Sequence, residues 1–177
     1  MTSVRQACHE DAWAIADLHV RTWRAAYRGL IPDDYLDSLS IEGRRQGWVE
    51  TLRGDTTTVL VAEGSGLLER FVAFGASRDH DTGGRVGEAY ALYVQPGAWR
   101  SGAGSALHDA AIQALAKADL IPATLWVLDS NAPARSFHAH RGWRPESAVK
   151  LDHSPGATLR EVRYRQDGTA CHAGEAG

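Results

Sequence analysis

The sequence predicts an α/β fold in which a mixed β-sheet carries helices on both faces. The first observation is a block of short β-branched and apolar segments between residues 57 and 94. The second is an alternation of helical and strand-length segments between residues 102 and 164. The third is a helical stretch between a short first strand and that block. The predicted order is strand, helices, three strands, helix, strand, helix, strand.

The first fifty residues are predicted to form one strand and a helical cap. Residues 4–8 alternate as a short strand does. Residues 10–27 place apolar side chains near helical spacing and predict a long helix, which Gly29 can close. Residues 31–39 and 41–52 supply the further helical segments of the cap.

Three strands follow the cap. Residues 57–62 and 70–77 are rich in β-branched and apolar side chains, and the turn at residues 64–66 between them predicts a hairpin. Residues 80–84 form another turn, and residues 86–94 are predicted as the third strand of the block.

The remaining elements alternate between helix and strand. Residues 102–118 are alanine-rich and predict a helix, and residues 124–128 have the length of a short strand. Residues 131–140 are predicted to be helical again. The pattern weakens from Arg144 onward, where residues 161–164 are predicted as the last strand.

Chain length sets the domain organisation. The chain has 177 residues, of which 44% are hydrophobic. This is enough for one sizeable core and too little for two independent domains. We therefore expect one domain over residues 1–166. Residues 167–177 are small and polar, and we expect them to form a poorly ordered tail.

Charge and cysteine content exclude several classes of protein. The formal net charge is -3, so there is no basic footprint for nucleic acid. No run reaches the roughly 18 to 20 apolar residues of a membrane span, and no secretory core follows the N-terminus. Cys8 and Cys171 lie far apart and form neither a disulfide framework nor a metal-ligand pair. We expect a soluble cytoplasmic protein without a nucleic-acid or membrane partner.

The segment from Val94 to Leu107 runs from a strand end through a glycine-rich turn into a helix. Such a turn presents unpaired backbone amides, and Gly102 and Gly104 allow an anion to approach them closely. The helix start adds about half a positive charge, and Arg100 can reach the same anion. We interpret the turn as a pyrophosphate site; the alternative is a tight strand-to-helix connection. Neither a Walker A ending nor a complete dinucleotide fingerprint is present.

Two motifs resemble those of the GNAT acetyltransferases. Residues 92–96 and 99–104 resemble the acetyl-coenzyme A motif Gln/Arg-x-x-Gly-x-Gly/Ala, with Trp99 where Gln or Arg is commonest. Residues 125–137, followed by Gly142 and Trp143, resemble the second motif. In that motif an Asn, here Asn131, meets the pantetheine arm or its neighbouring backbone. The resemblance covers about residues 4–165.

The resemblance implies a central, mostly antiparallel mixed sheet with helices on both faces, the GNAT acyltransferase fold. It also implies acetyl-coenzyme A as co-substrate, no metal, and a pantetheine arm inserted between two splayed strands, here residues 88–94 and 124–128. The residues that it places against the coenzyme are Leu92, Tyr93, Val94, Trp99, Arg100, Ser101, Gly102, Ala103, Gly104, Ser105, Asn131, Arg135 and Phe137.

Acetyl transfer to an amine needs a neutral amine, a stabilised oxyanion and often a proton for the leaving thiolate. By resemblance, the backbone amide of Leu92 meets the thioester carbonyl. Glu88 lies four residues earlier, which predicts the same strand face, and is the candidate base, directly or through a water. The alternative for Glu88 is an exposed carboxylate at the start of the strand. Tyr90 can relay the proton or serve in packing.

His138 stands where many family members have a tyrosine general acid. A histidine with an ordinary pKa of about 6.5 can donate a proton near neutrality. The alternative is a solvated histidine on the helix face. His138 and His140 do not face each other on a helix, so no metal site is expected.

The sequence gives least information about the residues that bind the acceptor. Trp23, Tyr27 and Asp33 come from the helical cap, which flanks the acceptor groove in related proteins. The alternative is that the two aromatic residues are core and that Asp33 begins a helix. We expect a small-molecule or peptide amine as acceptor, and a homodimer is compatible with the resemblance. The other hypotheses are a GNAT-fold module that binds coenzyme A without turnover, and an acetyltransferase that modifies a macromolecule.

Overall fold

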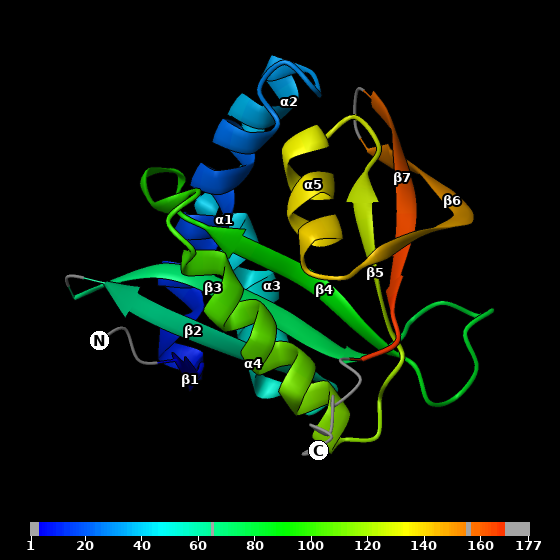
Figure 1. Cartoon of the computed structure of the whole chain (residues 1–177). Coiled ribbons are helices and arrows are strands. Elements are labelled where there is room, and N and C mark those ends of the chain that lie inside the picture. The colour runs from blue at the N-terminus through cyan, green and yellow to red at the C-terminus, as the bar shows by residue number, and fades with distance from the viewer. Residues whose placement is uncertain (1–3, 65, 155–156, 169–177) are drawn as a thin grey trace, which may run out of the picture.

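The structure is a computed structural model of the chain and describes residues 4–64, 66–154 and 157–168. Figure 1 shows a twisted sheet with helices packed on it. The elements are β1 (Val4–Gln6), η1 (His9–Asp11), α1 (Ala12–Ala26), α2 (Asp33–Ser38), α3 (Ile41–Arg53), β2 (Thr57–Gly64), β3 (Leu67–Ala76), β4 (Gly87–Val94), η2 (Pro96–Ala98), α4 (Ala103–Lys117), β5 (Ala123–Leu128), α5 (Ala132–His140), β6 (Arg144–Ser154) and β7 (Ala157–Gln166).

The described strands form one seven-stranded sheet in the order β1-β2-β3-β4-β5-β7-β6. The β4–β5 pair is parallel, and the other neighbouring pairs are antiparallel. A parallel pair needs a crossover, which α4 supplies between β4 and β5. The predicted mixed sheet, its helical cap and the helix after the glycine-rich turn are confirmed.

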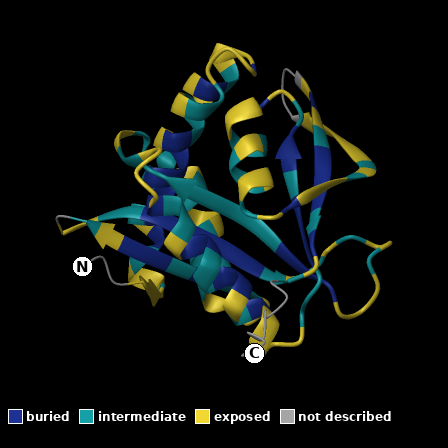
Figure 2. Ribbon diagram, viewed as in Figure 1, coloured by how far each residue is buried: buried dark blue, intermediate teal, exposed yellow. Residues whose placement is uncertain are grey.

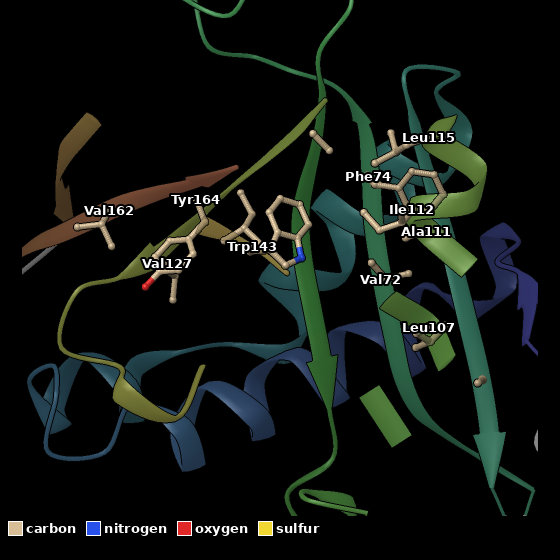
Figure 3. Close-up of a cluster of buried hydrophobic side chains, with 13 residues drawn as sticks. Val72, Phe74, Leu107, Ala111, Ile112, Leu115, Val127, Trp143, Val162 and Tyr164 are labelled. Atoms are coloured by element: carbon tan, nitrogen blue, oxygen red, sulfur yellow. The ribbon is translucent and has the colours of Figure 1, made fainter. Parts of the chain in front are cut away.

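Both faces of the sheet are covered. On one face, Ile15 and Leu18 of α1 pack against Val59, Val61 and Phe71, with side chains of α3 beside them. The other face carries the larger core, which joins α4 to the strands on both sides of the parallel pair (Figure 3). Figure 2 shows β5 and much of β3 as buried, whereas β4 between them is mostly of intermediate burial. The expectation of helices on both faces is confirmed.

The prediction missed β6 and began the last strand too late. β6 pairs with β7 and lies at the edge of the sheet, so its outer side chains contact solvent. Val149 and Leu151 are 42% and 56% exposed. With little of β6 buried, its sequence has no apolar alternation to reveal a strand. The predicted tail lies outside the described residues from residue 169 onward.

None of the helices in the described part of the chain is long and apolar enough to cross a membrane.

Candidate active site

The candidate site lies where β4 and β5 separate. Their pairing covers residues 87–89 of β4 and 123–125 of β5, and it is not described beyond Ala89. The rest of both strands therefore borders a gap in the sheet. The predicted splay of these two strands is confirmed.

A β-bulge at Tyr90, next to this gap, changes which residues of β4 direct their backbone amides toward β5. Ala89 and Ala91 pair with consecutive residues of β3, so Tyr90 is an extra residue. Before the bulge, Gly87 donates a hydrogen bond across to Pro122 (2.9 Å), which shows that odd-numbered amides face β5 there. After the bulge the alternation is reversed.

Because the alternation is reversed after the bulge, the Leu92 amide points into the gap. Gln95 N–H donates to the Glu69 carbonyl of β3 at 2.8 Å. In an antiparallel pair, bonded residues alternate with residues whose amides point the other way. Tyr93 therefore bonds toward β3, and the N–H of Leu92 points toward β5, which is unpaired with β4 at that height.

The prediction that Glu88 and Leu92 share a face is wrong because of this bulge. Leu92 packs against the α4 core, whereas Tyr90 and Tyr93 pack against the core beneath α1 and α3. Glu88 pairs opposite Gly75 and lies on the α1 side, together with Tyr90. The side chains of Glu88 and Leu92 thus lie on opposite faces of the sheet, whereas the Leu92 amide lies in the plane of the sheet and borders the gap.

Glu88 is buried, so the alternative of an exposed carboxylate is wrong. The residue is 3% exposed. One carboxylate oxygen accepts the backbone N–H of Arg78 at 2.8 Å and the other accepts its guanidinium at 3.0 Å. That guanidinium lies over the Tyr90 ring, 3.9 Å from its centroid. Burial raises the pKa of Tyr90, whose hydroxyl donates to the Ala76 carbonyl.

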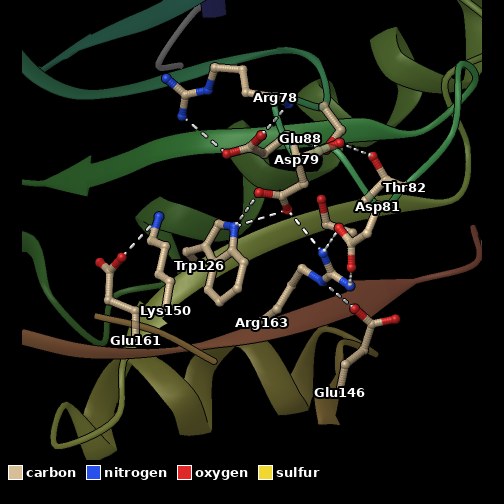
Figure 4. A network of polar contacts seen from close by, with 12 residues as sticks. Arg78, Asp79, Asp81, Thr82, Glu88, Trp126, Glu146, Lys150, Glu161 and Arg163 are labelled. Carbon is tan, nitrogen blue, oxygen red and sulfur yellow. Dashed lines mark hydrogen bonds and ion pairs between the residues drawn. The ribbon is translucent and has the colours of Figure 1, made fainter. Parts of the chain in front are cut away.

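A network on the same face holds the β3–β4 loop in place (Figure 4). The guanidinium of Arg163, on β7, is only 10% exposed and pairs with Asp79 and Asp81 of the loop and with Glu146 of β6. The indole N–H of Trp126 donates to Asp79 at 3.0 Å. The sequence prediction did not identify these residues. The charged residues alternating with Val162 and Tyr164 indicate a polar strand face, but not its contact with a distant loop.

The aromatic residues of α1 belong to the packing beside the gap. The indole N–H of Trp23 donates to the Tyr93 hydroxyl at 2.8 Å, and Trp23 packs edge-on against Tyr27. Burial raises the pKa of both tyrosines. Asp33 is the first residue of α2 and forms an ion pair with Arg28. These contacts agree with the structural alternative for all three candidates, and their acceptor role stays a prediction.

The glycine-rich turn has the backbone of an anion cradle. Arg100 and Gly102 both have positive φ, at 60° and 80°, and Gly102 precedes the first residue of α4. Alternating backbone conformations of this kind make successive N–H groups converge. Ala103 and Gly104 begin α4, so their N–H groups have no acceptor within the helix. Ser105 N–H, in contrast, donates to the Gly102 carbonyl at 3.0 Å.

Trp99 and Ser101 shape the turn. The Trp99 indole N–H donates to the Val94 carbonyl at 2.7 Å, and the Ser101 hydroxyl donates to Ala98 at the same distance. The polar atom of Trp99 therefore stabilises the backbone. Trp99 therefore offers no polar side-chain atom in place of the Gln or Arg of the motif that the segment resembles, and Arg100 lies beside it in the sequence.

Three candidates on α5 are held by packing and caps. The Asn131 side chain accepts the Ala134 N–H at 3.2 Å and caps the helix. The Arg135 guanidinium bonds to Asp129 and to the Tyr164 hydroxyl. A Cβ added to Gly104 would lie 3.5 Å from the Phe137 ring, which is ordinary van der Waals contact. Contact between these residues and the coenzyme stays a prediction.

His138 faces inward, so the alternative of a solvated histidine is wrong. Its ring lies against Phe137, Trp143 and Tyr164. Its Nδ1 atom is buried without a hydrogen-bond partner among the described residues. Burial, with a smaller effect of neighbouring His108, lowers the pKa of His138 to about 4. The expectation of titration near 6.5 is therefore wrong, and His138 is neutral at pH 7.

The described residues contain no group of three or more His, Cys, Asp or Glu side chains that could hold a metal ion.

A family sequence model and a curated relative both match most of this chain. The sequence model of the acetyltransferase (GNAT) family matches residues 12–143. An uncharacterized N-acetyltransferase of Bacillus subtilis, YuaI, is 33% identical over 92% of this chain and 91% of its own.

Solved structures share the fold. PaiA N-acetyltransferase from Thermoplasma acidophilum, in complex with coenzyme A, has a TM-score of 0.71 at 19% identity, covering 93% of this chain and 99% of its own. The structure of yncA from Salmonella typhimurium with its cofactor acetyl-CoA has a TM-score of 0.70 at 20% identity, covering 100% of this chain and 99% of its own.

Proposed function

Because the chain belongs to the acetyltransferase (GNAT) family, we propose that it transfers an acetyl group from acetyl-CoA directly to an amine in a ternary complex. The chain is an acyltransferase of the N-acetyltransferase type. The matched residues, 12–143, include both the gap between β4 and β5 and the glycine-rich turn.

The residues present fit the co-substrate. The N–H groups at the start of α4 and the positive φ of Arg100 and Gly102 suit a pyrophosphate, which accepts hydrogen bonds and favours a helix N-terminus. Gly102, Ala103 and Gly104 would hold it. When bound, acetyl-CoA supplies the acetyl group as a thioester. The relatives solved with coenzyme A and acetyl-CoA support this choice.

The Leu92 amide carries the proposal. It is a backbone N–H that points into a gap in the sheet, as the register of β4 requires. A donor fixed by the sheet can stabilise the negative charge that develops on an acetyl carbonyl oxygen without reorganising. Removal of one such donor typically costs about 10² to 10³ in rate.

Glu88 and Tyr90 are the proposed proton acceptors on the α1 face. Glu88 takes a proton from the acceptor amine, directly or through a water, and Tyr90 relays it. Both oxygens of Glu88 bond to Arg78. The Arg78 side chain is 65% exposed and lies on a loop, so it can leave Glu88 when an amine arrives.

We propose that the thiolate leaves without protonation by His138. His138 is neutral at pH 7 and has no cationic proton to give. A thiol pKa of about 8.5 makes the thiolate a tolerable leaving group by itself. We assign His138 to the packing of α5 against Trp143 and against Tyr164 of β7.

The acceptor is proposed to be a small-molecule or peptide amine, acetylated in the cytoplasm. Besides the ion pair of Lys150 with Glu161, the network of Figure 4 includes four carboxylates (Asp79, Asp81, Glu88 and Glu146) and two cations (Arg78 and Arg163). This excess of negative charge favours cationic amines. Pairing into a homodimer remains compatible with the family.

Release of the coenzyme A thiol, measured with a thiol reagent while acetyl-CoA and an amine are varied, tests the proposal. We expect amine-dependent release with intersecting double-reciprocal lines. Binding of acetyl-CoA without amine-dependent release across a panel of polyamines, amino acids and peptides would indicate the silent coenzyme A module. Parallel lines would contradict direct transfer.

A further inference from the structure

A cavity lies away from the candidate active site, where β7 ends. Its volume is about 630 Å³, within the range of about 300 to 1,000 Å³ that small-molecule sites occupy. Its walls come from the middle of α4, the turn after α5, the start of β6 and the end of β7. Its lining shares no residue with the proposed coenzyme, thioester or acceptor sites. The cavity is therefore a candidate site for a separate ligand.

Gln166 brings a buried acceptor without a donor to this cavity. The residue is 6% exposed and lines the cavity. Its side-chain NH₂ group donates to the Arg141 carbonyl at 3.1 Å, which fixes the orientation of the amide. The other polar atom, Oε1, is buried and has no hydrogen-bond partner within residues 4–64, 66–154 and 157–168. A buried oxygen in this state costs free energy, which a ligand with an O–H or N–H group would offset.

Two arginines lie directly opposite each other beside the cavity. Arg144 of β6 pairs with Arg165 of β7, and both residues line the cavity. Like charges in this arrangement repel each other. Arg165 forms an ion pair with the exposed Asp167 at 2.8 Å, whereas Arg144 has no ion pair with any residue that the structure describes. An anion bound between the two guanidinium groups would relieve their repulsion.

The other charged groups of the cavity already have partners. Arg141 forms an ion pair with Asp109. The Trp143 indole N–H donates to His108 Nε2 at 2.8 Å, so the proton of this imidazole is on Nδ1, which donates to Asp109 at 3.0 Å. Asp109 is thus held by two donors. The lining contains three arginines and two aspartates, so with histidine neutral one positive charge is left for a ligand.

We infer that this cavity binds a small hydroxy acid, with the carboxylate on Arg144 and Arg165 and the hydroxyl donating to Gln166 Oε1. A guanidinium matches the two oxygens of a carboxylate, and such charge-assisted bonds are about twice as strong as neutral ones. An amino acid also carries a donor, but its ammonium would add a positive charge to a lining that already has an excess of arginine. A single negative charge with a neutral donor fits both the charge and the unpartnered oxygen.

The test is an NMR titration of the full chain with lactate, 3-hydroxypropionate and propionate, which lacks the hydroxyl. The side-chain NH₂ signals of Gln166 report on the cavity itself. We expect at least one of the two hydroxy acids to bind the wild type about 5- to 100-fold more tightly than propionate, as for a hydrogen bond to a buried unpaired acceptor.

Two variants should change the affinities in different ways. Arg144→Met should weaken the hydroxy acid and propionate alike, by about 10- to 100-fold, and Arg144→Lys should lose less. Gln166→Met should bind the hydroxy acid no more tightly than propionate and leave propionate unchanged. Arg144 is exposed, so its variants should fold even if Gln166→Met does not. The control Arg53→Met, at an exposed position of α3, should bind all probes as the wild type does.

Several outcomes would overturn the inference. These are Gln166 signals that none of the probes shifts, equal affinities of the wild type for propionate and both hydroxy acids, or wild-type affinities in Arg144→Met. Tighter binding of free L-alanine than of either hydroxy acid would show that the site takes an ammonium group instead. Displacement of the hydroxy acid by coenzyme A would assign the cavity to the coenzyme. None of these readouts uses thiol release, so the result is independent of the proposed function.

Discussion

Replacement of Glu88 by glutamine removes the proposed base with little change in shape. The amide keeps one oxygen that can accept the Arg78 backbone N–H, now at 2.8 Å. It loses the negative charge and can no longer take a proton from the acceptor amine. We expect the turnover number to fall about 10² to 10⁴-fold, the range of a lost general base. Affinity for acetyl-CoA should stay within a few-fold, because Glu88 is not among the residues proposed to hold the coenzyme.

The fold should survive this change. The Glu88–Arg78 ion pair involves an arginine whose side chain is 65% exposed, so solvent screens it and the pair contributes about 1 kcal/mol or less. The glutamine NH₂ group faces the Arg78 guanidinium and loses a partner, which costs about 1 to 3 kcal/mol. The sum is smaller than the 5 to 15 kcal/mol by which domains are usually stable.

The assay is amine-dependent thiol release at saturating acetyl-CoA, with urea unfolding to establish that the variant is folded. Glu161→Gln is the matched control. Glu161 lies on β7, pairs with Lys150 and has no proposed role in proton transfer, so its variant should retain activity within a few-fold. A folded Glu88→Gln protein with turnover within three-fold of wild type, or an equal loss in Glu161→Gln, would refute the assignment.

Three further predictions concern the turn, the buried histidine and the loop network. A Cβ at Gly102 would meet open space, but Gly102→Ala forces a side chain into the left-handed region at a cost of about 1 to 2 kcal/mol. Calorimetry should show weaker coenzyme A binding for this variant. The control Gly97→Ala, which also meets open space and has no positive φ, should bind as the wild type does. The pKa of His138 is about 4 in the folded chain and about 6.5 in the unfolded chain, so the unfolded chain binds more protons between these values and stability rises with pH across that window. Urea unfolding at pH 5 and 7 should show a smaller rise in stability for His138→Phe than for the wild type. An equal rise in the two proteins would contradict the lowered pKa. Arg163→Met leaves three carboxylates without their shared cation and should cost about 3 kcal/mol in urea unfolding, whereas a loss below about 1 kcal/mol would show that the loop is held otherwise.

Local patterns in the sequence predicted most of the fold. Helices at residues 10–27 and 102–118 and the hairpin after residue 57 follow from apolar periodicity and turn residues, and each lies within a few residues of its observed place. β6 was missed because an exposed edge strand needs no apolar alternation. The last strand was shortened for a related reason, since its buried residues alternate with arginines that pair across the face.

The site was harder to predict because it depends on register. The glycine-rich turn was identified because glycine stands where the backbone needs it, as the positive φ of Gly102 shows. The bulge at Tyr90 leaves no mark in a single sequence, yet it reverses which amides and side chains face the gap. Glu88 was therefore placed on the wrong face although it was correctly placed near the gap. The burial of His138 depends on packing by Trp143 and Tyr164, which no spacing reveals.

Hydrogen exchange of the Leu92 amide, followed by NMR with and without acetyl-CoA, tests most directly whether the gap beside β4 seats the thioester. Tyr93 N–H, which the register directs to β3, is the internal control. We predict that saturating acetyl-CoA slows exchange at Leu92 and shifts its amide resonance, while exchange at Tyr93 changes little. An unchanged Leu92 amide in protein saturated with acetyl-CoA would contradict the proposed role of that amide.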